Sequence, residues 1–194
     1  TDADDNTVFG YNALTSDTLG SKTVAIGRSV LSSQNFTTAT DTYNTAVGYG
    51  AGGQVTTAIR NTLIGGLVGD ALTEGARNTG VGYGVLSADT LGSRNVGIGY
   101  EVLGSQNFTT ATDSYNTAVG YSAGNAVTTG IRNTIIGAEA GDALTDADNN
   151  VAIGFRALSS DTLGSKSVAI GDVALFSQNF TTASDSYNVA IGHE

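Results

Sequence analysis

The 194-residue chain contains no cysteine, proline, methionine or tryptophan, and only one histidine. Without cysteine it has no disulfide and no thiolate ligand or nucleophile, so hydrogen bonds and packing must hold the fold together. The single histidine, His193, stands beside Glu194 and gives the many Ser and Thr residues no plausible base for a catalytic triad. The acidic residues recur with the repeat described below instead of converging on one place, so we expect no enzymatic activity.

Basic residues are also scarce: 8 Lys and Arg stand against 18 Asp and Glu, which gives a net charge of −10. This charge repels nucleic acid and anionic membranes, so we expect neither as a partner. No apolar run approaches the ~18 residues of a membrane span, and we expect no membrane insertion. The first ten residues lack the basic-then-apolar order of a signal peptide, so we expect any secretion signal or anchor to lie outside these residues.

Glycine is abundant, with 27 residues, and many of them close a five-residue phrase, Asn-Thr/Val-small-Val/Ile-Gly. The phrase ends at Gly10, Gly27, Gly48, Gly65, Gly82, Gly99, Gly120, Gly137, Gly154, Gly171 and Gly192. The steps are 17 or 21 residues, and one long step after three short ones gives a super-repeat of 72 residues (120 − 48 and 192 − 120). Neither end has a polar cap, so we expect 1–194 to be one continuous repeat segment, an excerpt of a longer fibre or a subunit capped by its neighbours.

Each phrase alternates with a period of two, which is typical of a β-strand. Val24 and Ile26 share one face of the second such strand, and equivalent branched residues recur in the other copies. The opposite face holds mostly Ala or Gly, at Ala25, Ala46, Gly80, Gly97, Ala118 and Ala152. Because strands without side chains allow close backbone approach, we expect this Ala/Gly face to be the contact with other chains.

A second aliphatic pair follows each of several closing glycines and predicts a second short strand after a tight corner: Ala13-Leu14, Val30-Leu31, Val85-Leu86, Val102-Leu103 and Ala157-Leu158. Two strands and two turns in 17 residues make one rung of an all-β parallel β-solenoid, or β-roll. Ten steps at the ~4.8 Å strand spacing predict a rod on the order of 50 Å long. The asparagine that opens most phrases should stack from rung to rung and satisfy corner backbone groups.

The phrases SVAIG (167–171), TVAIG (23–27) and NTAVGYGAG (44–52) resemble the head repeats of trimeric autotransporter adhesins. The stretch TTGIRNTIIGAEAGDALTD (128–146) is similar to the related repeats of bacteriophage tail fibres. The resemblance implies a left-handed β-roll, side-by-side association of three chains, and a rod that presents adhesive or receptor-binding surfaces. It thus implies an extracellular fibre segment, on a virion or a cell surface. The alternative is a non-adhesive extracellular filament, open to glycosylation in its host, that forms by end-to-end stacking.

The 21-residue coils, which we call the long coils, contain residues that the shorter 17-residue coils lack and that are candidates for binding. They combine aromatic rings with amide groups, a mixture that binds sugars, so we expect contacts with a cell-surface glycan or receptor. The candidates are Gln34, Asn35, Phe36, Tyr43, Gln106, Asn107, Phe108, Tyr115, Gln178, Asn179, Phe180 and Tyr187. In the alternative interpretation, the phenylalanines fill a locally wider core and the tyrosines cover a corner. The sequon Asn-Phe-Thr also makes Asn35, Asn107 and Asn179 candidate glycosylation sites.

Two acidic stretches are weak candidates for calcium, and we expect no other cofactor. Asp2 and Asp4, and likewise Asp146 and Asp148, place carboxylates at alternate positions like the start of a calcium loop. Both stretches lack the glycine and the later glutamate of such a loop. The alternative is that these side chains close turns.

Overall fold

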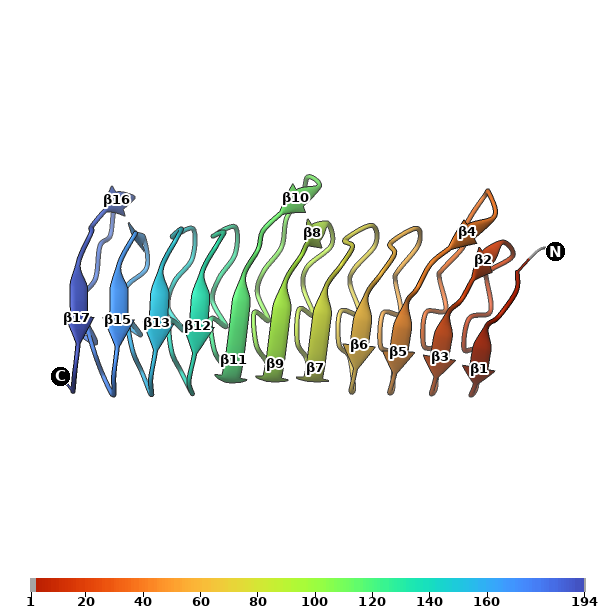
Figure 1. The fold of residues 1–194 in the computed structure, drawn as a ribbon, viewed down its shortest axis with the longest axis horizontal. Helices are drawn as coiled ribbons and strands as arrows, with labels where there is room; N and C mark the ends of the chain where they lie inside the picture. Colours follow the sequence, from red (N-terminus) through yellow and green to blue (C-terminus); the bar gives the residue numbers. More distant parts are fainter. Residues whose placement is uncertain (1–2, 194) are drawn as a thin grey trace.

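The computed structural model describes residues 3–193, and within them the chain forms an all-β parallel solenoid without helices (Figure 1). Eleven strands of this part of the chain form one sheet in sequence order. They are β1 (Thr7–Phe9), β3 (Val24–Ile26), β5 (Thr45–Val47), β6 (Thr62–Ile64), β7 (Thr79–Tyr83), β9 (Val96–Tyr100), β11 (Thr117–Tyr121), β12 (Thr134–Ile136), β13 (Val151–Ile153), β15 (Val168–Ile170) and β17 (Val189–Ile191). The pairing keeps the phrases in register, so the predicted solenoid and its tandem repeat are confirmed.

The second strand of each rung is not where the sequence pattern predicts it. Residues such as Val30-Leu31 and Val85-Leu86 lie in turns, and the leucines of all five predicted pairs have φ between 46° and 55°. Within residues 3–193, second strands of two residues occur only beside the long coils: β2 (Gly20–Ser21) pairs with β4 (Thr40–Asp41), β8 (Gly92–Ser93) with β10 (Thr112–Asp113), and β14 (Gly164–Ser165) with β16 (Ser184–Asp185). Burial of the turn leucines offsets the cost of the left-handed backbone.

The two faces of the main sheet are the reverse of the prediction. Ala25, Ala118 and Ala152 have no exposed surface, and they point into the rod. The branched residues on either side of each alanine or glycine point outward and are half-buried or exposed. The predicted contact face of Ala and Gly is therefore part of the core and does not contact other chains.

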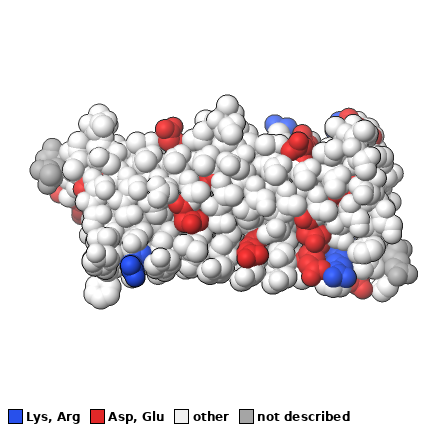
Figure 2. All heavy atoms as spheres, turned by 180° about the vertical axis from the view of Figure 1, so that it is seen from behind, with Lys and Arg blue, Asp and Glu red and all other residues white. Residues whose placement is uncertain are grey.

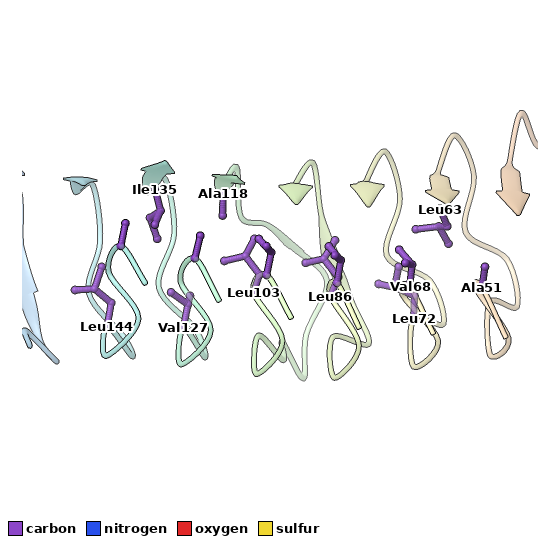
Figure 3. Close-up of a cluster of buried hydrophobic side chains, with 14 of the residues drawn as sticks. Ala51, Leu63, Val68, Leu72, Leu86, Leu103, Ala118, Val127, Ile135 and Leu144 are labelled. Atoms are coloured by element: carbon purple, nitrogen blue, oxygen red, sulfur yellow. The ribbon is translucent and has the colours of Figure 1, made fainter. Parts of the chain in front are cut away.

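Limited space inside each rung explains this reversal. Side chains from the strands meet aliphatic side chains from the turns in one continuous core along the rod (Figure 3). A Cβ built on Gly97 of β9 would lie 2.5 Å from Cγ1 of Val85, so only glycine fits beside this turn. Leu63 fits on β6 because the nearby turn contains Gly52, which has no side chain. The volume of a rung is thus shared between strand and turn, and a small residue in one accompanies a large residue in the other.

Two columns of backbone-directed contacts fix the register of the rungs. The predicted asparagine ladder is confirmed: Asn78 accepts a hydrogen bond from the backbone N–H of Asn95 at 2.9 Å, and its amide donates to the carbonyl of Gly92 at 2.8 Å. Buried members of the ladder are Asn44, Asn61, Asn78, Asn95, Asn116, Asn133 and Asn150. The closing glycines stack so closely that a Cβ on Gly82 would overlap the carbonyl oxygen of Gly99. With φ near 138°, Gly82 also has a backbone conformation that other residues rarely adopt.

Among the residues that the structure describes, no helix has the length and apolar character needed to cross a bilayer.

Candidate receptor-binding surface

The three long coils protrude from the same long edge of the rod. This is the edge at which the strands of the main sheet begin. In Figure 1 the loops that carry β4, β10 and β16 rise above the neighbouring rungs. The protruding segments are residues 37–39, 109–111 and 181–183, all of them exposed. Because the rungs are stacked in register, the long coils recur every four rungs, at intervals of ~19 Å. The long coils therefore form a row of equivalent projections along this edge.

The glutamines and phenylalanines of the predicted set lie inside the coil. Gln34 and Gln106 have no exposed surface, and Phe36 and Phe108 are 5% exposed. Gln178 and Phe180, in the last long coil, are half-buried. Burial of Phe36 and Phe108 agrees with the alternative interpretation, in which the phenylalanines fill a wider core, and the two buried Gln–Phe pairs offer almost no surface to a receptor.

A buried polar network holds each long coil against the rung before it. In the central copy, Gln106 donates to the Asp89 carboxylate at 2.6 Å and accepts from Asn116 at 2.8 Å. The same carboxylate accepts the backbone N–H groups of Gly92 at 3.0 Å and Phe108 at 3.3 Å. Burial raises the pKa of Asp89, and the hydrogen bonds to Gln106 and to the backbone oppose that shift. Donors therefore surround the carboxylate and compensate for its burial.

The aspartates of this network, Asp17, Asp89 and Asp161, are not among the residues predicted from the sequence. A signal for them exists: the stretch Asp-Thr-Leu-Gly-Ser occurs only in the rung before each long coil. Asp17 and Asp161 bond Gln34 and Gln178 as Asp89 bonds Gln106. An aspartate that always precedes the long coil by one rung is the residue expected to anchor it.

The outer part of each long coil carries a cation, a carboxylate and an aromatic ring. In the first copy, the Lys22 ammonium group lies 2.6 Å from the Asp41 carboxylate and 5.4 Å from the centre of the Tyr43 ring. The hydrogen bond to Lys22 lowers the pKa of Asp41, and the same bond raises the pKa of Lys22. The equivalent clusters are Arg94, Asp113 and Tyr115, and Lys166, Asp185 and Tyr187. We call these three sets the long-coil clusters.

The remaining predicted residues of the long coils are accessible. Asn35, Asn107 and Asn179 are exposed. Each side chain accepts a hydrogen bond from a threonine of the preceding rung, as Asn107 does from Thr90 at 3.1 Å. Tyr43, Tyr115 and Tyr187 are all about half exposed or more. The structure thus brings an asparagine, a tyrosine, a cation and a carboxylate to the surface of each long coil, and glycosylation of the three asparagines stays a prediction.

Two of the calcium candidates, Asp146 and Asp148, are engaged in turns. The Asp146 carboxylate accepts hydrogen bonds from the hydroxyl groups of Thr128 and Thr129, which lower its pKa, and Asp148 accepts the backbone N–H of Ile131 at 2.8 Å. Asp2 lies outside the described residues, and Asp4 is exposed. No group of three acidic, histidine or cysteine side chains suited to a metal ion occurs in the described part of the chain. The observed bonds agree with the alternative in which these side chains close turns.

Asn95 offers a test of the long-coil network. Its amide Nδ2 is buried and has no hydrogen-bond partner within residues 3–193, whereas the equivalent positions hold Thr23 and Ser167, whose hydroxyl groups accept from the long-coil glutamine. Oδ1 of Asn95 accepts hydrogen bonds from the Ser114 hydroxyl at 2.9 Å and from the backbone N–H of Asn116 at 3.1 Å, and a serine would lose both. The first copy shows what replaces them: the hydroxyl groups of Thr23 and Thr42 bond each other, and Thr42 accepts the backbone N–H of Asn44. Because the lost bonds are replaced in this way and the unpaired donor is removed, we expect Asn95→Ser to raise the free energy of unfolding by about 1 kcal/mol. The thermal midpoint should rise by ~2–4 °C in circular dichroism melts. A lower midpoint would show that the bonds accepted by the Asn95 carbonyl contribute more than the unpaired amide costs.

Comparison of the chain with protein-family models, curated proteins and solved structures gave no match.

Proposed function

We propose that this chain is a segment of an extracellular fibre, of a bacteriophage tail or a bacterial cell surface, that projects and presents receptor-binding surfaces. The observation that carries the proposal is the unbroken register of the rod: it aligns the three long-coil clusters on one edge, at regular intervals. A rod of stacked rungs with repeated, equivalent surface clusters suits display better than catalysis. Weak contacts in such a row reinforce one another, since engaging one raises the effective concentration for the next.

The proposed fibre includes side-by-side association through the outer face of the main sheet. This face consists of the first and third residues of each strand, which form two columns of Thr or Val and of Val, Ile or Phe; we call it the branched face. None of these side chains in the described strands is charged. Eleven strands and two columns give an uncharged strip on the order of 500 Å².

Other copies of the same chain are the occupant that fits the branched face. The strip is straight and runs along the whole rod, so it is covered best by an equally long and straight surface. Acidic groups are spread over the view of the rod in Figure 2, with few basic groups between them. Because the net charge is −10, contact through the uncharged strips keeps these repelling groups apart. Three copies are preferred on the resemblance to adhesin heads.

The long-coil clusters are the proposed contacts with a cell-surface glycan or receptor. We expect the triple variant Tyr43→Asn, Tyr115→Asn and Tyr187→Asn to stay folded, because Asn149 occupies the equivalent position with φ near 58°. Binding of the purified chain to an array of bacterial surface polysaccharides should fall by more than tenfold, since all three stacking surfaces are lost together. A matched control removes three exposed rings elsewhere, with Tyr11, Tyr49 and Tyr121 changed to Asn. Equal binding by the two triple variants would show that the long coils do not make the contact.

The alternative proposal is a non-adhesive extracellular filament that forms by end-to-end stacking of repeat segments. Filaments that lengthen with protein concentration in negative-stain images would support this candidate.

A further inference from the structure

A groove lies at the other ends of the main-sheet strands, away from the long coils. It has a volume of about 440 Å³ and crosses four rungs, from Asp70 through Tyr83 and Glu101 to Asn125. Tyr83 begins a row of stacked rings, with its centroid 5.5 Å from that of Tyr100. On the other side of Tyr83 lies Gly66, which has no side chain to cover the ring. The groove therefore combines an exposed aromatic surface with a path along the rod.

Two carboxylates give the groove more hydrogen-bond acceptors than donors. Oδ1 of Asp70 is buried and has no partner among residues 3–193, and the carboxylate of Glu101 and the hydroxyl groups of Ser87 and Ser105 line the same space. No lysine or arginine of the described chain lines the groove. A ligand rich in hydroxyl donors would satisfy these acceptors, whereas an anionic ligand would meet two carboxylates and no cation.

The equivalent positions one super-repeat later, 72 residues on, hold different side chains, so the repeat alone does not produce this groove. There, Arg156 and Glu139 replace Gly84 and Leu67, and the arginine Nε pairs with the glutamate at 2.5 Å. The guanidinium group also covers the ring of Phe155, at 5.1 Å from its centre. Asp142, the equivalent of Asp70, again has an unpaired oxygen, so the carboxylate alone does not define the site. The uncovered ring and the small groove residues distinguish the central copy.

We propose that the groove binds an unbranched neutral glycan, laid along the rod, with one sugar ring stacked on Tyr83. Aromatic stacking and hydroxyl-to-carboxylate hydrogen bonds are complementary to the two surfaces of a pyranose ring. Four rungs span ~14 Å, which accommodates about three sugar units. The acidic lining selects against sialylated, sulfated and uronic glycans. The inference rests on this groove alone and holds whether or not the long-coil clusters bind a receptor.

The test is isothermal titration calorimetry of the unmodified chain with maltohexaose, mannohexaose and chitohexaose, and with hyaluronan as the anionic probe. At least one neutral hexasaccharide should bind and hyaluronan should not. Tyr83→Ala should weaken the binding at least tenfold. The double variant Leu67→Glu and Gly84→Arg, which copies Glu139 and Arg156, should abolish it; Arg156 has φ near 53° and Gly84 near 62°, so the backbone accepts the change.

Two controls show whether the sugar binds in this groove or elsewhere on the rod. Tyr121→Ala removes a ring of the same stacked row outside the groove, and it should leave the affinity unchanged. The long-coil triple variant should also bind normally, so failure of the fibre proposal and failure of this one are distinguishable. The proposal is overturned if no neutral hexasaccharide binds, if hyaluronan binds equally well, or if both groove variants bind normally. It is also overturned if calcium alone gives a binding signal that Asp70→Asn abolishes and the sugars give none.

Discussion

Replacing Ala118 by glutamate should disrupt the rod, although an alanine in a strand of small residues looks replaceable. Ala118 is fully buried and lies between Gly97 and Ile135 of the neighbouring strands. A glutamate there would place an unpaired charge in an already filled core. We expect a loss of about 5 kcal/mol or more in the free energy of unfolding, and a fall of ~10–20 °C in the thermal midpoint.

The matched control for Ala118 lies on the same strand. Thr117 points outward and is half-buried, so Thr117→Glu adds the same charge at the adjacent position but keeps it in contact with water. Circular dichroism should show a normal β spectrum and only a small shift in the midpoint for this variant. If Ala118→Glu melted like Thr117→Glu, the assignment of the inner and outer faces would be wrong.

The double variant Ile98→Glu and Ile136→Glu should separate the associated chains while each rod stays folded. Both side chains lie on the branched face and are about 40% exposed, at 40% and 38%. Because the face would repeat in every copy, two glutamates per chain would bring like charges together in an otherwise uncharged contact. A like-charge contact costs several kcal/mol, so we expect sedimentation as a monomer at concentrations where the unmodified chain associates.

A second double variant controls for net charge. Thr37 and Thr109 are exposed on the long coils, away from the branched face, and Thr37→Glu with Thr109→Glu adds the same two charges. This variant should sediment like the unmodified chain. Dissociation of both variants would show that total charge, and not the branched face, determines association.

The solenoid could be predicted from the sequence because the same motif recurs along the chain at fixed intervals. The closing glycines and the ladder asparagines recur at fixed steps, and each has a backbone reason to do so. The choice of inner face could not be made from alternation, which assigns residues to two faces without saying which is inside. Hydrophobicity favours burial of Val24 and Ile26, but buried turn leucines such as Leu31 and Leu86 already occupy the interior volume of the rung. A core this narrow leaves room only for Ala or Gly on most strands.

The candidate surface was predictable in part. The recurrence of the long coil identified a segment that projects from the rod, and the structure places Asn35 and Tyr43 on its surface. Gln34 and Phe36 are buried, and Gln34 is held by Asp17 of the preceding rung, which no local pattern in the long coil contains. The groove at Tyr83 was missed because its residues come from four rungs, and only the fold brings them together.

Sedimentation of the unmodified chain tests the central proposal most directly. Analytical ultracentrifugation over a range of concentrations reports both mass and shape, and circular dichroism of the same sample reports the β content. We expect an elongated, defined oligomer, with three chains preferred, whose rods are fully folded. A monomer with complete β content at every concentration would contradict side-by-side association through the branched face.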